Sequence, residues 1–325
     1  MEEKEKPDEV KNLLPGSILI SAAILGGAWL YRTEPKTADE EQTKVSENAE
    51  RTAVSELEGA VLPSEGITLP VTWGDLGSRL ASVGAIDGEQ FRALYEERGQ
   101  FTDEYKELLL GNSAGKLRMT RENAGHLLNL FWALGLASKN PVLDSGEMTN
   151  PIYGGPENFA STAGWTIAKG NPMEHYSRHK FFILTTEQQA LVGKVSKGIF
   201  RPCCDNSTHF PDCNHGMAML GLLELMASQG VSETEMWKTA LAVNSYWFPD
   251  TYLTIAAYMK KNKGVDWGNV SPEEMLGADY SSAFGYARIA AQVTAPQQGS
   301  GGGGCDVDTG GASVPAPRPQ TGCVI

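Results

Sequence analysis

A long run without any charged side chain, residues 12–31, constrains this chain more than any other feature of its sequence. Leucine, isoleucine and alanine dominate residues 13–31, which at about 1.5 Å per helical residue span roughly 30 Å, the thickness of the hydrocarbon core of a bilayer. Trp29 and Tyr31 close the run, where aromatic rings favour the membrane interface. We therefore expect residues 13–31 to form a transmembrane anchor, with the lipid bilayer as a partner.

The competing interpretation of this run is a cleaved signal peptide, for which Gly26, Gly27 and Ala28 offer a small-residue cleavage site. The preceding tail, residues 1–12, is net negative, whereas a secretory signal begins with a positive segment. The tail therefore favours an uncleaved signal-anchor. Basic residues flank the run on both sides, so the positive-inside rule does not fix its orientation. We expect the simplest arrangement, a single-pass protein of the cell membrane whose C-terminal domain is extracytoplasmic.

Composition divides the remainder of the chain into three parts. Residues 32–72 contain no aromatic residue and many acidic ones, which is typical of a solvated linker. Residues 73–295 carry the apolar and aromatic residues of a globular domain and are numerous enough to bury a sizeable core. Residues 296–325 contain a glycine run and closely spaced prolines, the composition of a flexible or disordered tail.

The charge balance excludes one class of partner. The chain has 27 basic and 40 acidic residues, which gives a formal net charge of −13. Binding to a nucleic acid requires a basic surface that displaces counterions from the phosphates. We therefore expect no nucleic-acid partner.

The apolar spacing in the globular part is mostly that of helices. It predicts helices over residues 73–83, 87–98, 102–110 and 120–137. Three further helix starts carry capping signals, at Thr185, Ser232 and Ser271, the last with Pro272 at the first helical position. Sustained alternation of β-branched residues between hairpin signals is lacking, so the sequence predicts a mainly α, multi-helix domain. Residues 139–172 are rich in glycine and proline and should be irregular.

Three of the five cysteines, Cys203, Cys204 and Cys213, lie close together in the sequence. Two of the five histidines, His209 and His215, fall in the same stretch. Thiolate and imidazole are the ligands that soft and borderline ions prefer, so this motif predicts a site for a transition metal: copper, zinc or iron. Its spacing matches neither the usual zinc patterns nor a haem-attachment sequence, so the spacing does not identify the ion.

Residues 215–228, after this motif, are apolar around most of a helical circumference and should form a buried helix. Cys213 would then lie at the helix N-terminus, where free backbone N–H groups and the macrodipole favour a thiolate and lower the thiol pKa. Glu224 interrupts this helix, and it either reaches solvent, is paired, or lies beside the metal. His126 lies in an earlier apolar helix and is expected to belong to the core.

A second pair of histidines, His175 and His179, has the spacing that metal-binding helices use. If this segment is helical, the two rings share one face; the alternative is a pair that faces solvent. The sharper hypothesis is that both histidines meet Cys213 and His215 in space and complete the ligand shell, a role that His209 can also fill.

Two other interpretations of the cysteines remain open. In an oxidising compartment Cys213 pairs with Cys203 or Cys204, and a disulfide that closes so short a loop stabilises a fold by roughly 2–3 kcal/mol. Cys305 and Cys323 are candidates for a further disulfide in the tail. The chain would then be a disulfide-stapled interaction or structural domain without catalysis. Alternatively, a thiol pair is redox-active and the chain is a thiol oxidoreductase, so the sequence leaves open whether the chain is an enzyme.

The motif and the helix after it also resemble a known family. The residues concerned are Pro202, Cys203 and Cys204, then residues 212–216, an apolar helix, and a Gly-x-Ser-x-x-Glu helix start at Gly230. Together they resemble bacterial membrane-tethered proteins with a PCYCGC motif. This chain departs from that family by having adjacent cysteines where the family alternates them. The resemblance implies that Cys203, Cys204 and Cys213 bind a metal.

Overall fold

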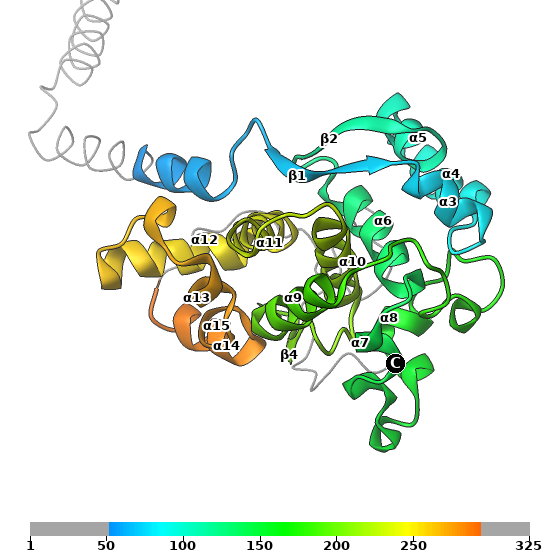
Figure 1. Ribbon diagram of the computed structural model, residues 1–325. Coiled ribbons are helices and arrows are strands. Elements are labelled where there is room, and N and C mark those ends of the chain that lie inside the picture. The colour runs from blue at the N-terminus through cyan, green and yellow to red at the C-terminus, as the bar shows by residue number, and fades with distance from the viewer. Residues whose placement is uncertain (1–51, 294–325) are drawn as a thin grey trace, which may run out of the picture. The chain divides into compact units, whose positions relative to one another are not determined.

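The computed structural model describes residues 52–293, and this part of the chain is mainly helical, as the sequence predicts (Figure 1). The expected anchor at residues 13–31, the tails at residues 1–12 and 296–325, and the linker up to residue 51 lie outside the described residues. Between residues 52 and 293 the structure contains no helix with both the length and the apolar character that a bilayer crossing requires.

A helix at residues 52–61 opens the described part, and two small antiparallel sheets follow among many helices. The strands are β1 (Ile67–Gly74), β2 (Ser113–Met119), β3 (Phe200–Arg201) and β4 (Cys204–Ser207). The longer helices are α3 (Leu76–Ser82), α4 (Gly88–Glu96), α5 (Asp103–Leu110), α6 (Ala124–Ala137), α9 (Thr186–Gly198), α10 (Asn214–Ser228), α11 (Glu233–Trp247), α12 (Pro249–Tyr258) and α15 (Ala283–Ala290). The short ones are α7 (Pro141–Asp144), α8 (Ala160–Ala163), α13 (Pro272–Leu276) and α14 (Ala278–Ser281).

The capping signals in the sequence correctly mark where helices begin. Thr185 caps α9 with a complete capping box, in which its side chain and that of Gln188 bond reciprocally to the backbone. Ser232 caps α11 with one hydrogen bond, which its side chain accepts from the backbone N–H of Glu235. Ser271 caps α13, with Pro272 at its first position. These side chains satisfy N–H groups that would otherwise lack a partner within the helix.

The antiparallel pair of β1 and β2, which α3, α4 and α5 separate in the sequence, is a feature that the sequence analysis missed. Strand β1 pairs with β2 from Ile67 opposite Met119 to Gly74 opposite Ser113. Alternate residues of β1 are buried, namely Leu69, Val71 and Trp73. Residues 54–72, which composition assigned to the linker, belong to the folded unit. The helix expected over residues 73–83 is present but begins at Leu76. The alternation covers one short strand with Pro70 inside it, which made it hard to distinguish from a polar linker.

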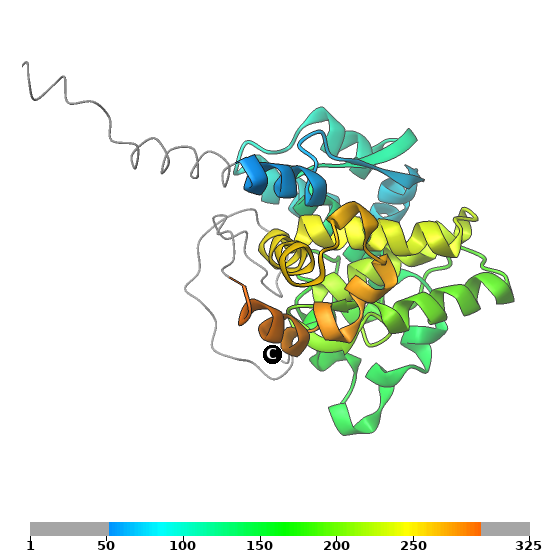
Figure 2. The same ribbon diagram turned by 90° about the vertical axis from the view of Figure 1, so that its left-hand side faces the viewer.

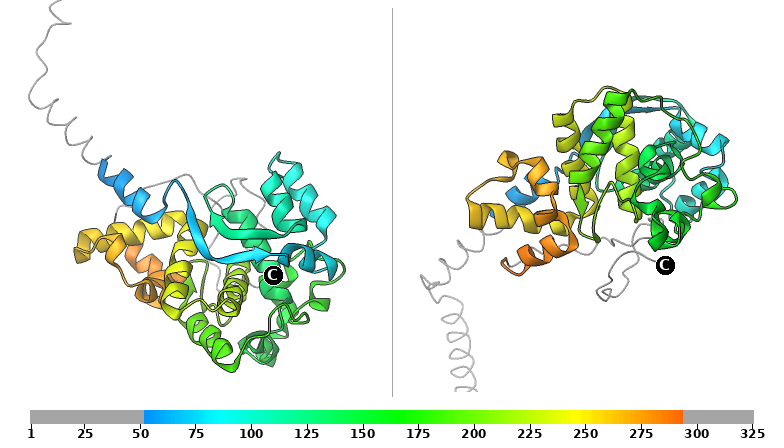
Figure 3. Two further views of the ribbon diagram at one scale, coloured as in Figure 1. Left: turned by 45° about the horizontal axis from the view of Figure 1, so that its top comes forward. Right: turned by 60° about the horizontal axis from the view of Figure 1, so that its bottom comes forward.

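Residues 139–172 are irregular, as predicted. The segment winds through short helices and the 3-10 turns η1 (Glu147–Thr149), η2 (Pro151–Tyr153) and η3 (Pro156–Asn158), and the turn η4 (Pro172–Glu174) follows it (Figure 3). The C-terminal helices α13, α14 and α15 pack together beside α11 and α12 (Figure 2).

Helix α10 is buried along almost its whole length and packs against α6 and α9 (Figure 1). The crossing with α6 is close because glycine faces glycine. A Cβ on Gly221 would lie 2.5 Å from the carbonyl oxygen of Phe131, and one on Gly135 would lie 2.0 Å from that of Met217. Backbones this near leave no room for a side chain. The first turn of α10 is therefore held in a fixed place, and the cysteine motif lies there.

Candidate metal centre

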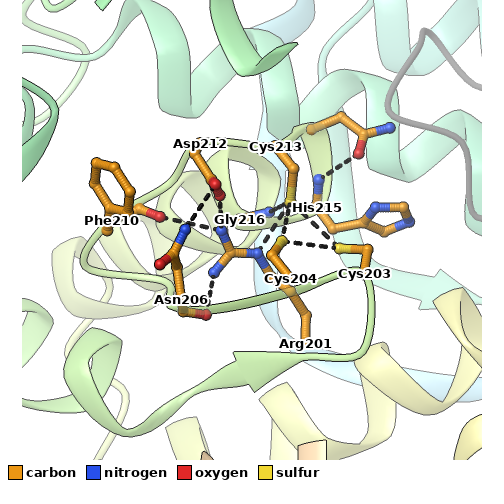
Figure 4. Close-up of polar contacts among 10 residues, drawn as sticks. Arg201, Cys203, Cys204, Asn206, Phe210, Asp212, Cys213, His215 and Gly216 are labelled. Atoms are coloured by element: carbon orange, nitrogen blue, oxygen red, sulfur yellow. Dashed lines mark hydrogen bonds and ion pairs between the residues drawn. The ribbon is translucent and has the colours of Figure 1, made fainter. Parts of the chain in front are cut away.

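The cysteine motif folds as a small hairpin followed by a helix cap. Strands β3 and β4 pair with Arg201 opposite Cys204, so Pro202 and Cys203 form the turn between them. The chain then returns to α10, where Cys213 is the N-cap residue and its Sγ accepts a hydrogen bond of 3.4 Å from the backbone N–H of Gly216. The sequence analysis predicted this position for Cys213. The hairpin turn and the helix cap bring all three cysteines together (Figure 4).

The three sulfur atoms, which we call the cysteine cluster, are mutual neighbours. The Sγ atoms of Cys203 and Cys204 are 3.2 Å apart, and each lies 3.5 Å from the Sγ of Cys213. Cys204 and Cys213 are buried and Cys203 is half-buried. All three cysteines are free, so the predicted disulfide between Cys213 and Cys203 or Cys204 is not formed in this structure. Cys305 and Cys323 lie outside the described residues.

Arg201 places a permanent positive charge beside the cluster, although its side chain is only 2% exposed. Its Nε donates a hydrogen bond of 3.0 Å to the Sγ of Cys213, and one terminal nitrogen lies 2.5 Å from an Asp212 carboxylate oxygen. The remaining donors reach the backbone carbonyls of Asn206 and Phe210 (Figure 4). Each nitrogen of this buried guanidinium has a hydrogen-bond partner, and these bonds connect the β3–β4 hairpin to the start of α10.

These contacts make Cys213 the thiolate of the cluster. Burial alone raises its pKa, but hydrogen bonds from the thiols of Cys203 and Cys204, together with the charge of Arg201, hold the pKa well below its ordinary value. The position at a helix N-terminus acts in the same direction. For Cys204, hydrogen bonding with its two neighbours and then burial raise the pKa. For Cys203, the hydrogen bond with Cys204 lowers the pKa, but the interaction with Cys213 and burial raise it well above the ordinary value.

Asp212 is the counterion of Arg201 in this buried site. Burial raises its pKa to about 6, while the neighbouring guanidinium and a hydrogen bond of 2.7 Å from the amide of Asn206 favour the charged form. The sequence analysis did not single out either member of this ion pair, because charged residues in a polar loop usually face solvent. A signal was present nonetheless, since Arg201 and Asp212 each lie within two residues of a cysteine of the motif.

Two groups of donor atoms in the cluster can hold a metal ion. The first group consists of Cys203, Cys213 and His215, and the second of Cys204, Asp212 and Cys213. Within each group the donor atoms lie within 4.8 Å of one another. The ring of His215 packs against Phe248, with ring centres 4.3 Å apart. Its Nδ1 is buried and makes no hydrogen bond of good geometry among the residues that the structure describes, although the ring is close enough to Cys213 to help lower the pKa of that thiol. Such an atom fits the role of a ligand, because a buried nitrogen without a partner is otherwise destabilising.

The other predicted histidines do not join the cluster. His175 and His179 do meet each other, with Nδ1 of His175 3.2 Å from Nε2 of His179, but neither belongs to a metal-holding group within residues 52–293. The segment is a turn, not a helix, and Ser177 between them has a φ of 53°. The ring of His175 is held instead by the carbonyl oxygen of Lys169, at 2.9 Å. Among the described residues, this pair therefore forms no donor group with the cysteine cluster.

His209 also lies apart from the donor groups. Its Nδ1 is 3.7 Å from a carboxylate oxygen of Glu147, in the irregular segment. Although His209 is close to the cysteines in sequence, it belongs to the loop between β4 and α10, whose backbone turns back toward α9 through a bond from His209 N–H to the carbonyl of Ser196. The prediction of His209 as a ligand is not supported by this placement.

The two remaining titratable groups of interest are structural. His126 is buried and its ring stacks on Tyr105 at 3.6 Å between ring centres, which confirms its place in the core, although neither ring nitrogen has a hydrogen-bond partner among the described residues. Glu224 is buried in α10 and accepts a hydrogen bond from the amide of Asn140, so of the three alternatives it is paired. Burial raises the pKa of Glu224 to about 8, although that hydrogen bond lowers it.

Comparison with known proteins adds no family to this description. A scan against protein-family models found no match. Searches of curated proteins and of solved structures found no match either. The arguments for function that follow therefore rest on the geometry and chemistry of the site.

Proposed function

We propose that this chain binds one thiophilic transition-metal ion through Cys203, Cys204 and Cys213, with His215 as the fourth ligand. The observation that carries the proposal is the convergence of three sulfur atoms within 3.5 Å of one another. Thiolates prefer copper(I), zinc(II) and iron, and three thiolates with one imidazole are a common zinc ligand set.

The surroundings of the cluster support this role. Metal ligands must be deprotonated, and the contacts of Arg201 and Gly216 already stabilise the thiolate of Cys213. The bonds from Arg201 also fix the orientation of that sulfur, as outer-shell groups do in metal sites. Cys203, the half-buried member, leaves a route for the ion to enter.

The test is metal binding by the full-length chain purified under a reducing agent. We expect one zinc ion per chain by elemental analysis and, after replacement by cobalt(II), the intense absorption of thiolate-to-metal charge transfer. Each of Cys203→Ser, Cys204→Ser and Cys213→Ser should weaken this absorption. The double variant Cys305→Ser/Cys323→Ser is the matched control, since it removes the same chemistry elsewhere in the chain, and it should bind as the wild type does. The proposal would be contradicted if the reduced chain bound no metal ion and Cys213 did not react with added metal.

A thiol oxidoreductase is the second candidate, and the thiolate of Cys213 favours it. A stabilised thiolate 3.5 Å from the half-buried Cys203 is the arrangement from which a disulfide forms and exchanges. Equilibration of the full-length chain with glutathione buffers separates the candidates. A redox enzyme should give a reversible two-electron transition near the potential of its compartment, whereas a metal site should resist oxidation while the ion is bound.

We also propose that this site is displayed outside the cytoplasm on a membrane tether. The support is the uncharged apolar run at residues 13–31 and the acidic character of the residues that follow. Protease treatment of intact cells should remove the C-terminal domain, while alkaline extraction should leave the chain in the membrane fraction. Release by alkaline extraction would contradict the anchor.

A further inference from the structure

The sulfur atoms of the cysteine cluster lie closer together than a tetrahedral ion requires. With a zinc–sulfur bond of about 2.3 Å, tetrahedral angles separate two thiolate sulfurs by about 3.8 Å. The observed separations are 3.2, 3.5 and 3.5 Å. With bonds of about 2.3 Å, such separations correspond to sulfur–ion–sulfur angles of roughly 90–100°. Angles near 90° are those of a pyramidal ion that carries a lone pair, of which arsenic(III) is the simplest example.

The charges around the cluster also select among ions. Arg201 and Asp212 form a buried ion pair whose charges sum to zero. Three thiolates around a trivalent ion also sum to zero, whereas they leave one negative charge around a divalent ion and two around a monovalent ion. An uncompensated charge in a buried site is unfavourable because it has lost its hydration. A trivalent ion therefore leaves no net charge in the cluster, whereas zinc leaves one negative charge that lies beside the guanidinium of Arg201.

We propose that the cysteine cluster also captures arsenic(III), as a pyramidal complex of Cys203, Cys204 and Cys213 in which His215 is not a ligand. This inference rests on the proposed function, because it requires the same three thiols to act together. It goes further by naming the class of ion, which is soft, trivalent and carries a lone pair. In solution such an ion is present as a neutral hydroxide.

The binding reaction exchanges oxygen for sulfur without any change of oxidation state. Arsenous acid, As(OH)₃, loses its three arsenic–oxygen bonds as three arsenic–sulfur bonds form. The oxygens leave as three water molecules. Each departing hydroxide needs one proton, which comes from the thiol that replaces it or, where that sulfur is already a thiolate, from solvent. The half-buried Cys203 is the member that a neutral hydroxide meets first.

Titration of the reduced full-length chain with arsenite tests the proposal, followed by ultraviolet arsenic–sulfur absorption and by intact mass under native conditions. We expect one arsenic per chain, with a mass gain of one arsenic less three hydrogens. Each of Cys203→Ser, Cys204→Ser and Cys213→Ser should bind at least about 100-fold more weakly, whereas His215→Ala should change the affinity by less than about threefold. The double variant Cys305→Ser/Cys323→Ser should titrate as the wild type does.

Zinc binding by the same samples separates this inference from the proposed function. His215→Ala should weaken zinc binding, since a tetrahedral ion needs its fourth ligand, and leave arsenite binding intact. Zinc binding without arsenite binding, or arsenite binding that depends on His215, would overturn the inference and leave the proposed function standing. If neither ion binds, both fail. Should a cysteine variant not fold, X-ray absorption of the arsenite-loaded wild type decides: three sulfur neighbours support the inference, and two sulfurs with one oxygen overturn it.

Discussion

At the scale of single residues, the site depends on a buried arginine and on the glycine that makes room for it. The guanidinium of Arg201 is where a Cβ on Gly216 would lie, since that Cβ would be 2.6 Å from its central carbon. Gly216 also donates its N–H to Cys213. A side chain at this position would therefore displace the group that stabilises the thiolate.

Gly216→Ala should raise the pKa of the Cys213 thiol toward its ordinary value of about 8.5, because the guanidinium is pushed away from the sulfur. Thiolate absorbance followed through a pH titration of the reduced chain measures this shift. Gly193→Ala is the matched control, because a Cβ there meets nothing within 4 Å. An unchanged titration in Gly216→Ala would show that Arg201 does not set the pKa of this thiol.

Glu224 makes stability depend on pH in a definite direction. Its pKa rises from 4.5 to about 8 on folding, chiefly through burial. The stability that this group contributes is fully present below its unfolded pKa and is lost as pH rises through the folded value. Glu224→Gln removes the titration but keeps an amide near Asn140. The wild type should therefore lose on the order of 3 kcal/mol relative to Glu224→Gln between pH 5 and pH 8. Denaturant unfolding at the two pH values checks this, and parallel changes in both proteins would contradict it.

At the scale of elements, the crossing of α6 and α10 fixes the position of the cluster. Gly135 and Gly221 allow the two helix backbones to approach, and α10 then presents Cys213 at its first turn. The hydrophobic pattern of both helices was evident in the sequence, as was the cap at Cys213. The close approach was not, because a glycine within a helix indicates nothing about which neighbour it faces.

Gly221→Ala should destabilise the fold by about 1–3 kcal/mol, because the added Cβ would overlap the backbone of α6. Thermal or denaturant unfolding monitored by circular dichroism measures the change. Gly193→Ala in α9 should instead be neutral or stabilising by up to about 1 kcal/mol, since alanine is the better helix former and space is open. Equal effects of the two substitutions would argue against the close crossing.

At the scale of the whole molecule, the helices followed from the sequence better than the site did. Capping residues and apolar periodicity act locally, so Thr185, Ser232 and Ser271 could be read directly. The convergence of the cysteines depended on one helix cap, which the motif indicated, and on one hairpin turn, which the sequence analysis did not predict. The segment of His175 and His179 turns instead of continuing a helix, which the spacing of the two residues did not reveal. The ion pair of Arg201 with Asp212 depends on burial, which tertiary packing decides.

Binding of an ion to the folded state alone should stabilise the whole domain. At a free zinc concentration of 100 times Kd the gain is about 2.7 kcal/mol, which should raise the unfolding temperature of the reduced chain by several degrees. The triple variant Cys203→Ser/Cys204→Ser/Cys213→Ser should show no such rise. A similar rise in both proteins would indicate that zinc binds elsewhere.

X-ray absorption at the zinc edge of the stoichiometrically loaded full-length chain tests the central claim most directly, since it counts the sulfur atoms bonded to the ion. The account predicts three sulfur neighbours and one nitrogen around a single zinc ion in the wild type, and two sulfurs after Cys204→Ser. An ion surrounded only by nitrogen and oxygen would contradict it.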